Sequence, residues 1–341
     1  PQTARTEPEA VKHFGDPDAA ATLLVRGTTD IALFAPLIQT FVARTPNSRV
    51  LYEQWASNDL YDSAVASCDT GENVADVVIS SAVDLMVKLV NDGCAAPHRS
   101  GLTEILPAEL NWRDELFGIT REPAVIVYNR NLVPEDEAPR SRFDLIDLLR
   151  PEDSRYIGRV ATYDIERSGL GYLFAFVDSL QATTFGSLIE AFDRAGAVAT
   201  CCSAEIIDGV VSGRYLIAYN VLGSYALARA AEVSSLVVVA PEDYTLVLSR
   251  AALIPRGAPH SPSAAAFVDF MLSEDGQRAM AAERLIVDFT DPDPVAGAFV
   301  YPADGPSSFR QIALSPVLLV GLDRQKKTLF LERWRATFMQ E

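Results

Sequence analysis

Apolar and polar positions along the first third of the chain alternate in the way that strands followed by helices produce. Residues 21–26 form a short apolar run that Gly27 ends, which predicts a buried strand. Apolar residues then recur at helical spacing from Phe34 to Val42, and since Pro36 is tolerated only in a first turn, the helix is predicted to begin near residues 33–35. Strands at 49–55 and 74–80 and helices at 58–67 and 82–90 follow. This alternation predicts a parallel sheet with helices on both faces.

A second alternating block lies between two long extended segments, residues 117–129 and 244–255. Its strands are predicted at 158–163, 215–220 and 236–240, and its helices at 169–180, 185–195, 204–211 and 224–231. The remainder is predicted to be helical at 262–272, 275–283 and 317–338. The predicted fold class is therefore α/β with two lobes, each a central, mostly parallel sheet flanked by helices, joined by two extended crossovers.

The same pattern divides the chain into four predicted parts. Residues 1–20 are polar and contain proline, and we expect a flexible lead-in. Residues 21–122 form the first part of lobe 1, and residues 123–246 form lobe 2. Residues 247–341 are expected to return to lobe 1 and to end in C-terminal helices.

Small polar residues follow the predicted strands wherever a helix begins. Ligands of open α/β sheets bind beyond the carboxyl ends of the strands, where free backbone N–H groups and the helix dipole favour an anion. Plain helix capping, for example by Ser57 or Asn58, is the alternative for any one loop. Because several loops share the feature, we predict a cleft between the lobes for an anion or a polyol. Its candidate residues are Thr28, Thr29, Asp30, Ser57, Asn58, Ser80, Ser81, Asp164, Arg167, Ser168, Gly169, Asn220, Gly223, Ser224, Tyr225 and Tyr244.

Composition and charge narrow the classes of partner. The 341 residues are 49% hydrophobic, enough for a globular core, and carry a net charge of −17. A field of that sign repels nucleic acid and anionic lipid, so neither is an expected partner. No run of about 18 apolar residues is present, so no transmembrane helix is expected.

Motifs of catalysis and of metal binding are missing from the sequence. It has no Gly-x-Ser-x-Gly elbow, no phosphate-binding loop and no dinucleotide fingerprint, so an enzyme is not expected. Carboxylates such as Asp164 and Glu166 are more common on surfaces than in catalysis. Three scattered histidines and no Cys-x-x-Cys spacing predict neither a metal nor a cofactor. Cys68 and Cys94 could form a disulfide, and this pairing stays open. Whether the adjacent Cys201 and Cys202 pair also stays open, because a bond between neighbours is strained and rare.

An ordered set of segments resembles a known family. Residues 23–41 and 75–98 resemble the first lobe of type II periplasmic solute-binding proteins of ABC importers, in the branch named after ferric-ion-binding proteins. Residues 121–131 resemble the first crossover of that family, 158–176 and 215–230 its second-lobe cleft segments, and 241–281 its return crossover. The resemblance covers roughly residues 20–285 and implies the type II periplasmic binding protein fold.

One departure from the ferric-binding branch bears on the ligand. Ferric-binding members carry a tandem tyrosine pair, whereas here Tyr219 and Tyr225 are six positions apart and no Tyr-Tyr dipeptide occurs. Phenolates suit a hard ferric ion, so the departure favours the organic-anion members instead. The resemblance therefore implies capture of a phosphorylated sugar or an organic acid for ABC import. A ligand-sensing partner of a two-component sensor kinase, or ferric-ion binding, is the alternative.

The resemblance also implies roles and a location. Thr28, Thr29, Ser80, Ser81 and Ser224 would capture the anion, with Arg167 as the charged partner. Asn58, Asp164 and Asn220 would bind ligand hydroxyls. We expect a periplasmic monomer that is exported by a signal peptide absent from this sequence, and that meets an ABC permease or a sensor kinase.

Overall fold

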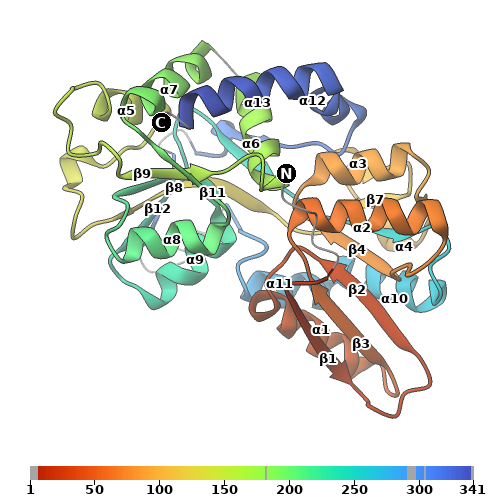
Figure 1. Ribbon diagram of the computed structural model, residues 1–341. Helices are drawn as coiled ribbons and strands as arrows, with labels where there is room; N and C mark the ends of the chain where they lie inside the picture. The colour runs from red at the N-terminus through yellow and green to blue at the C-terminus, as the bar shows by residue number, and fades with distance from the viewer. Residues whose placement is uncertain (1–6, 181–182, 290–296, 303–304, 339–341) are drawn as a thin grey trace. The chain divides into compact units, whose positions relative to one another are not determined.

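The computed structural model describes residues 7–180, 183–289, 297–302 and 305–338 (Figure 1). The chain divides into two α/β units, each built from three segments. Unit 1 holds the chain up to Arg121, Ser249–Ile286 and Ile312–Val320, and unit 2 holds Glu122–Leu248, Val287–Gln311 and the chain from Gly321. The predicted α/β class is confirmed.

The sheet of unit 1 is mixed and not mostly parallel as predicted, because its parallel centre is flanked by antiparallel strands. Strands β2, β3 and β4 are parallel to one another, whereas β1 pairs antiparallel with β3 and β14 pairs antiparallel with β4. The strand order is β1-β3-β2-β4-β14-β7-β6, with β5 paired to β14. The bounds are β1 Ala10–Gly15, β2 Thr22–Gly27, β3 Arg49–Gln54, β4 Val77–Ser80, β5 Ala95–Ala96, β6 Asn111–Trp112, β7 Leu116–Gly118 and β14 Ala251–Pro255.

Helices cover both faces of this sheet. Helices α1, α10 and α11 pack on one face around Phe34, Ile38 and Phe267, while α2 and α3 lie on the other (Figure 1). Strand β4 is accordingly buried on both faces, whereas β2 and β3 alternate buried with partly buried residues along their length. The bounds are α1 Ile31–Arg44, α2 Ser57–Thr70, α3 Val83–Asn91, α4 Gly101–Glu104, α10 Ser261–Leu272, α11 Glu274–Ala282 and α12 Leu319–Leu322, with 3₁₀ turns η1 Ala108–Leu110 and η4 Pro316–Leu318.

The sheet of unit 2 is built around β8, whose eight residues are all buried. Strand β8 is antiparallel to β11, β12 and β13, whereas β9, β10 and β11 are mutually parallel. The order is β10-β9-β11-β8-β12-β15, with β13 paired to β8 and to β16. The bounds are β8 Glu122–Asn129, β9 Val160–Tyr163, β10 Val198–Thr200, β11 Ile217–Leu222, β12 Leu236–Val239, β13 Thr245–Leu248, β15 Phe299–Val300 and β16 Phe309–Gln311.

The helices of unit 2 form two groups. Helices α8 and α9 lie side by side, and α13 packs along α7 (Figure 1). The rings of Phe185 and Tyr172 both contact Phe330 of α13. The bounds are α5 Arg142–Leu148, α6 Gly169–Leu180, α7 Thr183–Arg194, α8 Ser203–Val211, α9 Gly223–Glu232 and α13 Arg324–Phe338, with 3₁₀ turns η2 Glu135–Glu137 and η3 Gly305–Ser308.

Both ends of the chain differ from the prediction. Residues 10–15 of the predicted flexible lead-in form β1, because a sparsely apolar strand completes the open edge of β3. The C-terminal part does not return wholly to unit 1, since residues 287–311 and the chain from Gly321 belong to unit 2. The aromatic contacts of α13 with α6 and α7 explain that placement.

The extended segments and two helix starts also differ in detail. The two predicted crossovers are each split into a strand of unit 1 and a strand of unit 2, namely β7 and β8, and β14 and β13. Helix α1 begins at Ile31, whose N–H donates to Gln54 Oε1 at 2.9 Å, so Pro36 lies in its second turn. The N-cap of α2 is Ala56, not Ser57 or Asn58.

Candidate functional site

Three helices of unit 1 begin at one edge of its sheet. Because β2, β3 and β4 are parallel, their carboxyl ends share an edge, and α1, α2 and α3 start just beyond them. This arrangement brings seven of the predicted residues to that edge, in the connecting loops, at the end of β4 and in the first turn of α2. They are Thr28, Thr29, Asp30, Ser57, Asn58, Ser80 and Ser81. Within the part of the chain that the structure describes, none of these three helices is capped by the side chain of its N-cap residue.

Thr28 and Ser81 tie two of these loops together. Thr28 Oγ1 accepts a hydrogen bond from the backbone N–H of Ser81 at 3.0 Å and lies 3.2 Å from Ser81 Oγ. Ser80 Oγ accepts from the N–H of Ala82 at 3.1 Å, and both serines are buried. The hydroxyl-rich lining is thus held in place by short local bonds.

Arg250 places a positive charge at this edge. It precedes β14, and Ala251 pairs with Ser80, so Arg250 lies beyond the carboxyl end of β4. Arg250 is 1% exposed, and its guanidinium donates from Nη1 to Thr29 Oγ1 at 3.0 Å. Arg250 was not among the residues predicted from the sequence, although a single basic residue within the apolar run 244–255 was a signal for it.

Tyr52 supports Thr29 from the sheet. Its hydroxyl donates to the carbonyl of Thr29 at 2.7 Å, and burial raises the pKa of Tyr52 although the charge of Arg250 partly opposes the rise. Thr29 itself is fully buried, so its hydroxyl accepts from Arg250 and does not project into solvent. The threonine therefore fixes the guanidinium at the edge.

The first loop of unit 2 lies between β9 and α6. The N–H of Asp164 donates to Thr200 O at 2.7 Å, and Asp164 Oδ1 accepts from the N–H of Glu166 at 3.0 Å. Ser168 Oγ accepts from the N–H of Gly171 at 3.0 Å, just inside the start of α6 at Gly169. Arg167 is exposed. The predicted residues of this loop thus share one place in the fold.

The second loop of unit 2 turns from β11 into α9. Gly223 packs on the backbone of Pro123, where an added Cβ would lie 2.7 Å from the Pro123 carbonyl oxygen. Ser224 is fully buried, and its hydroxyl donates to the buried carboxylate of Glu122. A hydroxyl that gives its proton to a buried carboxylate does not offer it to an anion, which is unfavourable for the predicted role of Ser224. Tyr225 is half-buried.

Asp178 of α6 organises the polar interior of unit 2. Its Oδ1 accepts from Arg142 Nη2 at 3.0 Å and from the Tyr244 hydroxyl at 2.9 Å. Its Oδ2 accepts from the Tyr219 hydroxyl at 2.6 Å and from Asn220 Nδ2 at 3.0 Å. Asn220 and Tyr244 are both predicted ligand residues. The Asn220 amide nitrogen and the Tyr244 hydroxyl instead donate hydrogen bonds to the buried carboxylate of Asp178. Asp178 stands alone as an acid in an apolar helix, which was the sequence signal for it.

Backbone geometry and electrostatics explain this cluster. Asn220 has a φ of 59°, and β11 shifts register between Ala218 and Val221, so the side chains of Tyr219 and Asn220 both reach Asp178. Burial lowers the pKa of Arg142, but Asp178 together with Tyr219, Tyr244 and Asp243 raises it by more than burial lowers it. Burial raises the pKa of the Tyr219 and Tyr244 phenols, and Asp178 adds to the rise. Both phenols stay neutral donors.

Alkaline titration should show these neutral phenols. The folded pKa values of Tyr52, Tyr219 and Tyr244 lie above the unfolded value of about 10. Their contribution to stability is thus complete below pH ~10 and is lost as pH rises through the folded values. We expect tyrosinate absorbance at 295 nm to rise in two steps, the second coinciding with loss of the circular dichroism of the fold. A single transition near pH 10 in an intact fold would contradict this.

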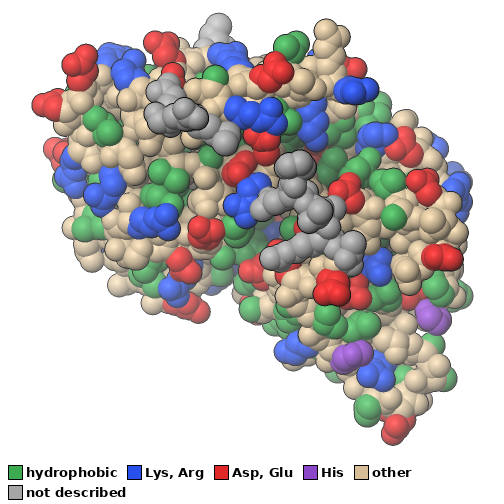
Figure 2. Space-filling view, viewed as in Figure 1, with side chains coloured by type: hydrophobic (Ala, Val, Ile, Leu, Met, Phe, Trp, Pro, Cys, Tyr) green, Lys and Arg blue, Asp and Glu red, His purple; other side chains and the backbone are tan. Residues whose placement is uncertain are grey.

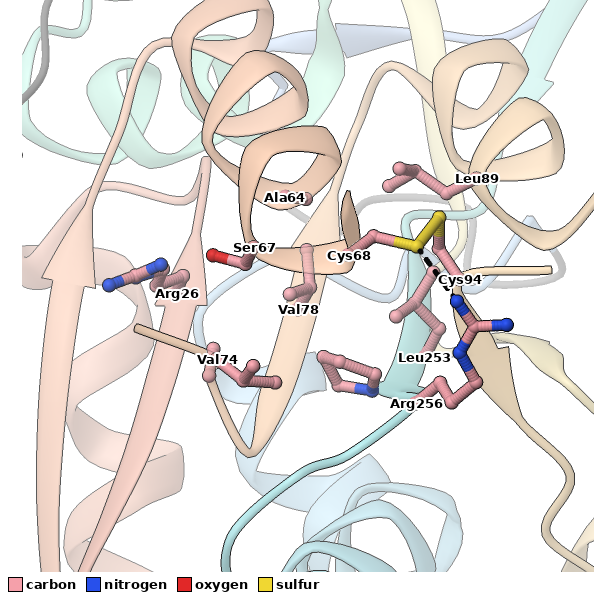
Figure 3. Close-up of a pocket in the computed structure, with 12 residues that line it drawn as sticks. Arg26, Ala64, Ser67, Cys68, Val74, Val78, Leu89, Cys94, Leu253 and Arg256 are labelled. Carbon is pink, nitrogen blue, oxygen red and sulfur yellow. Dashed lines mark hydrogen bonds between the residues drawn. A yellow bond between two sulfur atoms is a disulfide. The ribbon is translucent and has the colours of Figure 1, made fainter. Parts of the chain in front are cut away.

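A small, mostly apolar pocket lies at the opposite edge of the unit 1 sheet, where β4 begins (Figure 3). A disulfide joins Cys68 of α2 to Cys94, and Arg256 Nη2 lies 3.7 Å from Cys68 Sγ. Val74 precedes β4 and Arg256 follows β14, so this pocket is at the amino end of β4. It is distinct from the edge that carries Arg250.

The surface and the helices give two further observations. On the face shown in Figure 2, Lys and Arg side chains are interspersed with Asp and Glu, so the net negative charge is not gathered into one patch there. No described helix is both long and apolar enough to cross a membrane.

Comparisons with known proteins agree with one another. The family model described as bacterial extracellular solute-binding protein matches residues 22–283. The crystal structure of the substrate binding protein of the ABC transporter from Agrobacterium tumefaciens aligns with a TM-score of 0.87 at 34% identity, over 96% of this chain and 98% of that chain. A Sinorhizobium fredii protein named "Probable ABC transporter periplasmic-binding protein y4fP" is 28% identical over 66% of this chain. That alignment spans 63% of the relative's length.

More distant structures share the fold and differ in what they bind. AfuA from Actinobacillus pleuropneumoniae, solved with exogenous fructose-6-phosphate, aligns with a TM-score of 0.71 at 13% identity, over 94% of this chain and 99% of that chain. Iron-bound HitA from Pseudomonas aeruginosa aligns with a TM-score of 0.63 at 18% identity, over 76% of this chain and 84% of that chain. At these identities the likeness shows the fold alone.

Proposed function

Because the chain belongs to the bacterial extracellular solute-binding proteins, a family of binding proteins and not of enzymes, we propose that it captures a small anionic metabolite for an ABC importer. The ligand class is a phosphorylated sugar or an organic acid, and the location is the periplasm. The observation that carries the proposal is the buried Arg250 guanidinium, bonded to Thr29 at the edge where α1, α2 and α3 begin.

Several contributions at that edge favour an anion. Each helix N-terminus stabilises a nearby negative charge by about 0.3–1 kcal/mol, and by more in a partly buried geometry. The buried charge of Arg250 acts in a medium less polar than water, where its attraction to an anion is stronger. The hydroxyls of Thr28 and Ser81 add hydrogen-bonding groups for an oxyanion. Together they offset the repulsion from a chain of net charge −17.

Ferric ion fits the described residues less well. It prefers several hard, anionic oxygen ligands that converge on one point. The phenols of Tyr219 and Tyr244 instead donate to Asp178 and stay protonated. In addition, the positive charge of Arg250 at the edge of unit 1 repels a cation. The interlobe cleft, the monomeric state and the sensor-kinase alternative stay predictions.

Thermal denaturation with a ligand panel tests the proposal. Fructose 6-phosphate, other sugar phosphates and organic acids are the probes, since AfuA was solved with the first of these. A ligand at about 100 times its dissociation constant stabilises the fold by about 2.7 kcal/mol, a melting shift of a few degrees. We expect such a shift with at least one anion and, with ferric citrate, none beyond that of citrate alone. A shift specific to ferric citrate would refute the assignment.

A further inference from the structure

Two adjacent cysteines follow the last residue of β10 and precede α8. Cys201 and Cys202 form a disulfide between neighbours, a pairing that the sequence had left open. Cys201 is half-buried, and Cys202 is exposed, as is Glu205 one turn further on. Reagents in solution therefore have access to the pair.

The carboxylate of Glu205 lies against both sulfurs. Its Oε2 is 3.0 Å from Cys201 Sγ and 4.0 Å from Cys202 Sγ. Its Oε1 accepts a hydrogen bond from Thr200 Oγ1 at 2.9 Å, which orients the group. A disulfide sulfur has no proton to donate, so the carboxylate oxygen of Glu205 lies against the two sulfurs without accepting a hydrogen bond from either. A thiol proton or a bound cation would make the same contact favourable.

The start of α8 favours negative charge at this place. Cys202 is the N-cap of the nine-residue helix, and among the described residues its side chain caps none of the helix N–H groups. The helix dipole stabilises anions within the first turn, and thiolates are the form of cysteine that ligates metals. The N-terminus of α8 therefore stabilises the negative charges of two thiolates and one carboxylate at this place.

We propose that Cys201 and Cys202, when reduced, bind one thiophilic divalent cation such as Zn²⁺ together with Glu205. The three ligand atoms lie within 4.8 Å of one another. A tetrahedral zinc ion with Zn–S distances of about 2.3 Å needs its two sulfurs roughly 3.8 Å apart, so the reduced side chains must separate. The exposure of Cys202 gives room for that movement. The fourth position is left to water or a solute.

Oxidation state controls the site. A dithiol reductant breaks the S–S bond, supplies two electrons and two protons, and becomes a disulfide itself. Binding of the cation then releases the two thiol protons to solvent. The oxidised pair has no thiolate to offer, so the disulfide form does not bind. This inference is independent of the proposed anion site, because it uses none of the residues of that site.

Cadmium and zinc titrations test the inference on the whole chain. The protein is reduced with dithiothreitol, freed of reductant under argon and titrated with Cd²⁺, whose thiolate complexes absorb in the ultraviolet. Zn²⁺ affinity is then measured by competition with a chromophoric chelator. We expect one thiolate-bound Cd²⁺ per reduced chain and none per oxidised chain. Glu205→Gln should weaken Zn²⁺ binding at least tenfold, since outer-shell changes alone cost about 10–100-fold.

Paired serine variants separate this site from the other disulfide. Cys201→Ser/Cys202→Ser should abolish the cadmium band, whereas Cys68→Ser/Cys94→Ser should retain it. Circular dichroism checks that each variant is folded. The inference is wrong if the reduced wild-type chain shows no cadmium band, if the Cys201→Ser/Cys202→Ser variant keeps it, or if the pair resists reduction in the folded protein.

Discussion

Replacing Asp178 with alanine is expected to lower the free energy of unfolding by at least about 3 kcal/mol. The change removes the acceptor of four donors, one of them the buried guanidinium of Arg142. Asp243 still contacts Arg142 at 3.2 Å, so the charge keeps one partner. The hydroxyls of Tyr219 and Tyr244 lose theirs, and each unsatisfied buried donor costs about 1–3 kcal/mol. Chemical denaturation measures the loss.

Two further variants test whether the loss of stability comes from the buried hydrogen bonds of Asp178. Asp178→Asn keeps the shape and one acceptor oxygen, so it should cost less than alanine. Asp208→Ala breaks an exposed pair with Arg229 and should change stability by about 0–1 kcal/mol. An Asp178→Ala protein within 1 kcal/mol of the wild type, by the same assay, would show that the buried network does not hold unit 2 together.

Arg250→Gln is expected to weaken binding of the anionic ligand by at least tenfold. A charged hydrogen-bonding group contributes about 1.5–3 kcal/mol, and 1.4 kcal/mol is one factor of ten. The glutamine removes the buried positive charge that Thr29 holds at the edge of unit 1. The dissociation constant is measured by calorimetry with the anion that gives the largest melting shift in the panel.

Two further arginine variants serve as controls for Arg250→Gln. Arg250→Lys keeps the charge and should retain more affinity than Arg250→Gln. Arg256→Gln removes a charge at the opposite edge of the same sheet and should leave binding unchanged. Equal affinity of Arg250→Gln and wild-type protein would remove Arg250 from the site.

The spacing of apolar residues predicted the helices and strands better than it predicted which of them pack together. Helix α6 was predicted at residues 169–180 and occupies Gly169–Leu180, because its apolar run is long and begins at a clear break. Strand β1 was missed because an edge strand with mostly exposed side chains shows no regular alternation. The placement of α13 in unit 2 depends on which aromatic rings it contacts, and spacing along the chain does not encode that.

The site was predictable as a set of loops but not as a set of side-chain directions. The loops at Thr28 and Ser81 lie together because parallel strands end at one edge. The hydroxyl of Ser224 points inward to Glu122, which is 102 residues away in sequence. Arg250 reaches Thr29 across 221 residues, a contact that only the sheet order produces. Local sequence shows that a helix begins, and tertiary packing decides which side chains face a ligand.

Mass spectrometry of the ligand carried by the protein tests the central claim most directly. The protein would be purified without added ligand at neutral pH and low salt and then denatured. The released small molecules would be identified, and metals would be measured in parallel. We expect a stoichiometric phosphorylated sugar or organic acid, with less of it on Arg250→Gln than on Arg256→Gln protein. Stoichiometric iron without an organic anion, or a neutral or cationic solute retained equally by both variants, would contradict the proposed capture of an anion.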